Sequence, residues 1–141
     1  MAGTLDPSTP GDQRGPVRGG FLTHVLPALL WTLAIFIGGA SGMPQPEVSF
    51  FELPFGFDKV QHVLAFGALQ ALCFRALRYE LPERRRRGLL WLAAFMALLA
   101  GIGLELYQLG LPDRSADVAD AAADGVGAAL GALLLDKLPW L

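Results

Sequence analysis

The sequence predicts an all-α integral membrane protein, a bundle of four transmembrane helices. Of its 141 residues, 53% are hydrophobic and 17% are charged, whereas a typical soluble domain has about 25% charged residues. The apolar residues gather in four long runs, each long enough as a helix to cross a hydrocarbon core about 30 Å thick. Only helices and closed barrels satisfy their backbone groups in such a core, and these runs are too long and continuous for barrel strands.

The N-terminal residues 1–20 are rich in Pro, Gly, Ser and Thr and have no apolar period, so we expect a disordered cytoplasmic tail. The remaining residues, 21–141, form one transmembrane domain. Its first apolar run, residues 21–40, has an alternative interpretation as a secretory signal peptide cleaved within the small-residue segment "GGASG". We favour a retained helix, because the run is long enough to span and cleavage would leave three spans.

Three further spans are predicted at residues 60–79, 88–110 and 117–138. Their orientation follows from the basic residues at the span ends, because Lys and Arg are enriched in cytoplasmic loops. Basic residues concentrate in the N-terminal tail and between the second and third spans, at Arg14, Arg18, Arg78 and Arg84 to Arg87. Both termini are therefore predicted to be cytoplasmic.

This topology brings ionisable residues from three spans to one layer at the outer face. The second and fourth spans begin there and the third ends there. The polar residues in this layer are Asp58, Lys59, His62, Glu105, Gln108, Asp113, Arg114, Asp117, Asp120 and Asp124. Asp117, Asp120 and Asp124 fall within an arc of about 60° on one helix face, and Gly127 and Gly131 continue it. Because small residues let a neighbouring helix approach closely, we expect this face to contact protein rather than lipid.

The same residues carry a resemblance to a known family. The sequence resembles the VanZ-like family of small bacterial membrane proteins at four places. These are D-K-x-x-H at 58–62, E-x-x-Q at 105–108, Arg114 and D-x-x-D at 117–120. The resemblance covers roughly residues 25 to 137. It implies a multi-pass protein of the bacterial cytoplasmic (inner) membrane, with a role in the cell envelope or in teicoplanin-type glycopeptide resistance.

Two positions depart from the pattern of that family. Asp124 stands where the family usually has Asn, and Val63 stands where an aromatic residue commonly follows the histidine, although Phe66 is nearby. The first departure adds a titratable group. Both leave open whether an inherited activity is intact.

One hypothesis is an envelope enzyme that acts on a lipid-linked or glycan substrate. His62 would be a general base or acid oriented by Asp58, and Glu105 would be the second acid/base group. The substrate-binding candidates are Lys59, Gln108, Arg114, Asp117, Asp120 and Asp124. Whether the protein is an enzyme is left open at this point.

Two further hypotheses need no catalysis. The polar residues could form a non-enzymatic receptor for an envelope lipid or glycan, or a structural network that pins the helices together. An ion pathway is disfavoured, because the inner halves of the helices offer little polar beyond Gln70 and Arg75.

No cofactor and no metal site are predicted. A metal bound by His62, Glu105, Asp117 and Asp120 remains a variant, but these spacings match no standard ligand motif. The expected partners are the lipid bilayer and an envelope lipid or glycan ligand. A net charge of −2 without a basic surface pattern argues against nucleic acid. The oligomeric state is not predicted.

Overall fold

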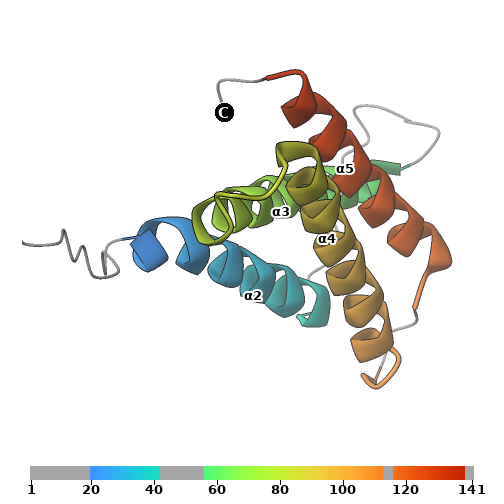
Figure 1. The fold of residues 1–141 in the computed structure, drawn as a ribbon. Helices are drawn as coiled ribbons and strands as arrows, with labels where there is room; N and C mark the ends of the chain where they lie inside the picture. The colour runs from blue at the N-terminus through green and yellow to red at the C-terminus, as the bar shows by residue number, and fades with distance from the viewer. Residues whose placement is uncertain (1–19, 42–55, 113–115, 139–141) are drawn as a thin grey trace, which may run out of the picture.

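The computed structural model describes residues 20–41, 56–112 and 116–138, and within these residues it contains helices and turns but no strand (Figure 1). Four helices are long and apolar enough to cross a membrane, by length and composition. The predicted fold of four membrane-competent helices is therefore confirmed. The cytoplasmic placement of the termini stays a prediction, and nearly all of the expected tail, residues 1–19, lies outside the described residues.

The first span begins with a π-helical turn, η1 (Phe21–Val25), that continues into α2 (Leu26–Ala40). Pro27 lies in the first turn of α2. Proline has no amide hydrogen and its ring clashes with the carbonyl four residues earlier, here that of Thr23. The wider π turn before Pro27 is consistent with this local disruption of the α-helical pattern.

The other three spans form an up-and-down arrangement of α3 (Gly56–Glu80), α4 (Arg86–Gln108) and α5 (Val118–Asp136). Helix α3 ends just before Leu81, whose successor Pro82 disfavours helical backbone at the preceding residue. The helix ends differ by up to four residues from the predicted spans 60–79, 88–110 and 117–138.

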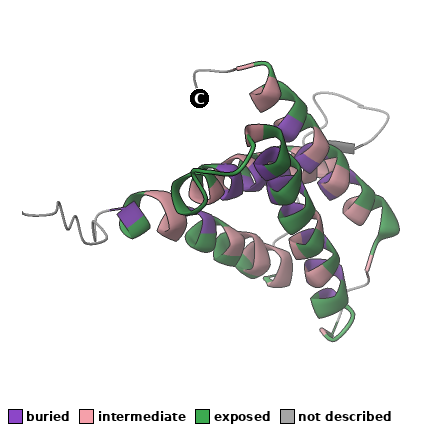
Figure 2. Cartoon of the chain, viewed as in Figure 1, coloured by how far each residue is buried: buried purple, intermediate pink, exposed green. Residues whose placement is uncertain are grey.

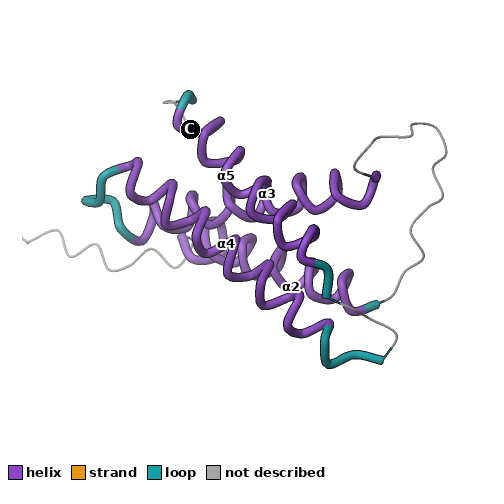
Figure 3. Tube along the Cα trace, turned by 90° about the vertical axis from the view of Figure 1, so that its right-hand side faces the viewer, coloured by secondary structure: helices purple, strands orange, loops and turns teal. Residues whose placement is uncertain are grey.

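Helices α3, α4 and α5 form the packed core, and their inward faces carry most of the buried residues (Figures 2 and 3). The closest approach is between α3 and α5. A Cβ atom on Gly127 would overlap the backbone of Val63, and one on Gly131 would lie 3.1 Å from the carbonyl oxygen of Gly67. The expectation that the Gly127 and Gly131 face contacts a neighbouring helix is confirmed.

Helix α2 is attached more loosely, and Ala28 is its one buried residue. Two polar contacts attach it to the core. The indole nitrogen of Trp31 donates to the Ala65 carbonyl at 2.9 Å, and Gln108 Nε2 donates to the Gly39 carbonyl at 3.1 Å. Large apolar side chains on the outward faces of all four helices are exposed, as expected for surfaces in contact with acyl chains.

Because α3, α4 and α5 alternate in direction, the bundle has two chemically different ends. We call the end where α3 and α5 begin and α4 terminates the acidic end. Its described ionisable residues are Asp58, Lys59, His62, Glu105, Asp117, Asp120 and Asp124. We call the opposite end, with Arg86, Arg87 and Asp136, the basic end.

Candidate functional site

The acidic end unites residues that are up to 66 positions apart in the sequence. Asp58, Lys59 and His62 occupy the first two turns of α3, and Glu105 is in the last turn of α4. Asp120 and Asp124 lie in the first two turns of α5. The structure thus brings three helices together at one polar layer, as the sequence predicts.

His62 is held in place by a carboxylate from another helix. Its Nδ1 atom lies 2.7 Å from Oδ1 of Asp124, which is fully buried. With Asp124 ionised, its carboxylate only accepts hydrogen bonds, and Nδ1 is then the nitrogen that carries the proton in this pair. In the neutral ring, Nε2 is then the nitrogen with the free lone pair. The sequence suggested Asp58 as the orienting residue, but the hydrogen bond that fixes the ring is made by Asp124.

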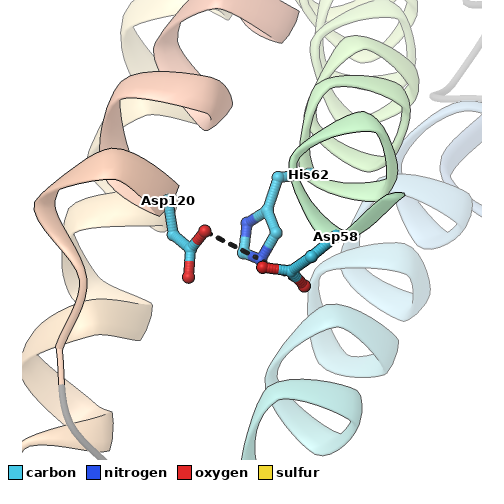
Figure 4. Close-up of side chains that lie close together, drawn as sticks. All are labelled: Asp58, His62 and Asp120. Carbon is cyan, nitrogen blue, oxygen red and sulfur yellow. Dashed lines mark ion pairs between the residues drawn. The ribbon is translucent and has the colours of Figure 1, made fainter. Parts of the chain in front are cut away.

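The Nε2 atom of His62 faces two other carboxylates (Figure 4). It lies 3.9 Å from Oδ1 of Asp58 and 3.8 Å from Oδ1 of Asp120. These distances allow electrostatic attraction but are too long for direct hydrogen bonds. The side chain of His62 is 19% exposed, so part of the ring is accessible from outside the bundle.

Lys59 is the counter-ion of this cluster. Its ammonium group donates to Asp58 at 3.4 Å, to Asp117 at 3.0 Å and, by a short contact, to Asp120. One lysine thereby links the start of α3 to the start of α5. The charges at this end are unbalanced, since five carboxylates surround one ammonium group and one imidazole among the described residues.

Asp117 caps α5 and connects it to α4. Its side chain accepts a hydrogen bond from the Ala119 amide at 2.8 Å, and its own amide donates to Oε2 of Glu105 at 2.7 Å. Asp is a favoured N-cap residue because it satisfies one of the unpaired amides of the first turn. The hydrogen bonds from Lys59 and from the Ala119 amide lower the pKa of the Asp117 carboxyl.

Buried oxygen atoms beside the cluster have no donor. Oε1 of Glu105 and Oδ2 of Asp124 are buried without a hydrogen-bond partner among the described residues. Glu105 interacts electrostatically with Asp120, Asp124 and His62. Deeper in the bundle, Gln70 donates to the Leu90 carbonyl at 3.3 Å, while its Oε1 is likewise without a partner. Unpaired buried polar atoms are rare and costly, which makes this end unusual.

A hollow of about 200 Å³ opens beside His62. Its polar wall consists of Asp58, Gln61 and His62. Its apolar wall consists of Ile35 and Gly38 from α2, Ala65 and Phe66 from α3, and Leu104 from α4. The sequence analysis assigned α2 no part in the site. The pair Gly38-Gly39 near the end of the first span, with no side chains to block an approaching group, was the available signal.

Among the described residues, Asp58 and His62 are the predicted site residues that line this hollow. Gln108 uses its amide nitrogen to hold α2 through Gly39. Asp113 and Arg114 lie outside the described residues. Arg114 therefore stays a predicted substrate-binding residue, and Lys59 is the cation that the structure places against Asp117 and Asp120.

Comparison with known proteins gives one match. A family model described as VanZ/LLP1 matches residues 20–138. No curated protein and no solved structure matches.

Proposed function

The chain belongs to the VanZ/LLP1 family, and from this premise we propose that its acidic end binds the polar part of a lipid-linked or glycan substrate of the bacterial envelope. We further propose that His62 exchanges a proton with that substrate. One observation carries the proposal: buried Asp124 holds Nδ1 of His62 at 2.7 Å, and His62 lines the hollow between α2, α3 and α4.

The lining of the hollow suits an amphiphile. Carboxylate, amide and imidazole groups form one wall, and aliphatic and aromatic groups form the other. A volume of about 200 Å³ is below the range of roughly 300–1,000 Å³ typical of pockets that enclose a whole ligand. It accommodates part of a headgroup, while the acyl or prenyl chain of a lipid-linked substrate remains among the lipids around α2.

The chemistry would be acid–base catalysis of a hydrolysis or transfer reaction. A histidine whose second nitrogen is held by a carboxylate is a suitable proton acceptor near neutral pH. Glu105 is the second acid/base candidate, and Asp58 contacts the same hollow. Lys59, Asp117 and Asp120 position the starts of α3 and α5 relative to each other.

The cellular role that follows is in envelope physiology, including teicoplanin-type glycopeptide resistance. The arginine residues between α3 and α4 favour a cytoplasmic location for the basic end. The acidic end would then face the outside of the bacterial cytoplasmic membrane, where lipid-linked envelope precursors are consumed.

The test compares glycopeptide susceptibility of cells that express wild-type protein or His62→Asn at matched levels. Asn retains an NH donor near the place of Nδ1, so it keeps the bond to Asp124, but it has no counterpart of Nε2. We expect cells that express His62→Asn to be as susceptible to glycopeptides as cells without the protein. Arg87→Ala, an exposed residue at the basic end, is the matched control and should retain wild-type protection.

A second candidate function, a purely structural network, is favoured by a specific set of contacts. Lys59 with Asp117 and Asp120, and His62 with Asp124, all connect α3 to α5. If the network only pins helices, His62→Asn should protect cells as well as the wild type does, because its bond to Asp124 is preserved. Full protection by this variant would therefore reject the catalytic proposal.

A further inference from the structure

We propose that the acidic end binds one divalent transition-metal ion between His62, Asp58 and Asp120. One ligand atom from each residue lies within 4.8 Å of the other two. Figure 4 shows the imidazole of His62 between the two carboxylates, which come from different helices. The three side chains are partly exposed, so an ion has a path from water at the membrane surface.

The distances fit ligands of one small cation. Nε2 of His62 is 3.9 Å from Asp58 and 3.8 Å from Asp120. With bonds of 2.0–2.1 Å, two ligands of a tetrahedral zinc ion lie roughly 3.4 Å apart. The carboxylates therefore need to approach Nε2 by a few tenths of an ångström and to close on each other from a separation of at most 4.8 Å, which rotation about their side-chain bonds provides.

The surroundings of His62 are those of a metal-ligating histidine. Such a residue usually donates its other ring N–H to a carboxylate, which fixes the ring and makes the ligating nitrogen more basic. Asp124, which is not one of the three ligands, supplies this carboxylate at 2.7 Å and is completely buried.

An independent observation is the unbalanced charge behind the three ligands. Glu105 is 7% exposed, interacts electrostatically with Asp120 and His62, and has a buried oxygen, Oε1, with no donor among the described residues. Oδ2 of Asp124 is in the same condition. Buried carboxylate oxygens without donors are costly, and a divalent cation nearby offsets that cost.

Lys59 provides a specific test of the proposal, because its ammonium group binds a carboxylate oxygen of Asp120 that the ion would also need. It donates to Oδ1 of Asp120, the atom that faces His62. Lysine and metal therefore compete for this carboxylate. Removal of the lysine should strengthen metal binding, whereas removal of a resident counter-ion from a merely structural cluster would only weaken the fold.

The donor set selects the class of ion. One imidazole nitrogen with two carboxylates suits Zn²⁺ or Mn²⁺, while Ca²⁺ and Mg²⁺ prefer oxygen ligands alone. Binding of the ion does not depend on the proposed function. Its use rests on the substrate-binding part of that function, because the carboxylates of the acidic end would otherwise repel an anionic headgroup. While the ion occupies Nε2 of His62, proton exchange falls to Glu105, the second acid/base candidate.

The experiment is a titration of Zn²⁺ into tag-free, chelator-treated full-length protein in detergent micelles, followed by calorimetry, with Ca²⁺ and Mg²⁺ as parallel arms. A His24→Ala background removes the other histidine of the chain. We expect one Zn²⁺ per chain and no comparable binding of Ca²⁺ or Mg²⁺. His62→Asn and Asp58→Asn should each weaken Zn²⁺ binding by at least about tenfold.

Two further variants separate the site from nonspecific attraction. Lys59→Met should bind Zn²⁺ more tightly than the parent, and Asp136→Asn, a carboxylate at the basic end, should bind it equally well. Zn²⁺ should raise the melting temperature of the parent but not that of His62→Asn. The absence of saturable binding in both the parent and Lys59→Met would overturn the proposal, as would unchanged affinity in His62→Asn.

The outcome is distinguishable from that of the proposed function. Loss of glycopeptide protection in His62→Asn, together with no Zn²⁺ binding by the parent protein or by Lys59→Met, would reject the metal and leave the acid–base proposal standing. Saturable Zn²⁺ binding by the parent protein that His62→Asn weakens, together with full glycopeptide protection in His62→Asn, would do the reverse.

Discussion

The two ends of the bundle use charge differently. At the basic end, Arg86 donates to the carbonyl oxygens of Leu135 and Leu138, pairs with Asp136 and lies over the ring of Phe74. The Leu135 carbonyl lies in the last turn of α5 and the Leu138 carbonyl lies just beyond its end, so Arg86 caps this helix terminus. At the acidic end, by contrast, carboxylates outnumber cations among the described residues, and two buried oxygen atoms have no donor.

The comparison separates a structural clamp from a candidate site. A clamp needs its central charges to have partners, and at the basic end Arg86 and Asp136 meet this condition. A functional site retains polar groups that the fold alone does not need, and buried polar atoms without hydrogen-bond partners are expected there. Changes at the basic end should therefore affect stability alone, while changes at the acidic end should affect function more than stability.

The largest effect on stability is expected from a change that disrupts the close contact between α3 and α5, because both ends of the bundle depend on it. In Gly127→Leu, the new side chain would overlap the backbone of Val63 and force α3 and α5 apart. We expect a loss of about 3 kcal/mol or more in the free energy of unfolding. Circular dichroism during thermal unfolding in detergent measures it. Gly88→Leu is the control, because nothing lies within 4 Å of its Cβ position; equal melting temperatures in both variants would contradict the packing described.

Asp124 tests whether the ring of His62 must be held. Asp124→Ala leaves Nδ1 of His62 without its acceptor and should lower the free energy of unfolding by about 1–3 kcal/mol. This variant should also lose glycopeptide protection. Asp124→Asn keeps an acceptor and matches the residue that the family resemblance implies at this position. It should unfold within about 1 kcal/mol of the wild type and retain protection. Protection by the Ala variant at wild-type level would show that orientation of the ring is unimportant.

Arg86 and Arg87 sharpen the description of the basic end. Arg86→Ala removes the cap on α5 and should lower the free energy of unfolding by about 1–2 kcal/mol. Arg87, with a side chain that is 81% exposed, should contribute less than about 0.5 kcal/mol. Chemical denaturation of the two variants compares them. Glycopeptide protection, corrected for protein level, should persist in both, and its loss in Arg87→Ala would contradict a purely structural role for this end.

Lys59→Met tests the charge imbalance directly. Without the ammonium group, Asp58, Asp117 and Asp120 repel one another, and we expect a loss of about 1 kcal/mol in the absence of metal. The loss should shrink as salt concentration rises, because exposed charges are screened. Lys137→Met, at the other end of α5, is the control. A Lys59 variant as stable as this control at low salt would mean that the ion pairs contribute nothing.

The smallest effect concerns pH and Asp117. Because the pKa of this carboxyl is lowered in the folded protein, its contribution to stability is present above the pKa of the unfolded chain. That contribution is lost as pH falls through the lower, folded value. When the pH is lowered from 6 to 3, the melting temperature of the wild type should therefore fall more than that of Asp117→Asn. Parallel curves would show that the pairing with Lys59 does not stabilise the fold.

The sequence predicted the framework well, because span length, small-residue faces and the phase of acids along one helix are local properties. It could not choose partners within the acidic end. Asp58 is one helical turn from His62 and was the natural candidate to orient it, yet Asp124 does so, because the close α3–α5 contact at Gly127 brings the two helices together. The contribution of Gly38 to the lining of the hollow depends on how α2 packs against α3 and α4, which no local sequence pattern specifies.

The most direct test of the account is the protonation pattern of His62, measured by nitrogen NMR of histidine-labelled protein in a His24→Ala background at alkaline pH, where the ring is neutral. The account predicts a proton on Nδ1 and none on Nε2, and a change in this pattern when Asp124 is replaced by Ala. A proton on Nε2 instead, or a spectrum that Asp124→Ala leaves unchanged, would contradict the arrangement on which the site depends.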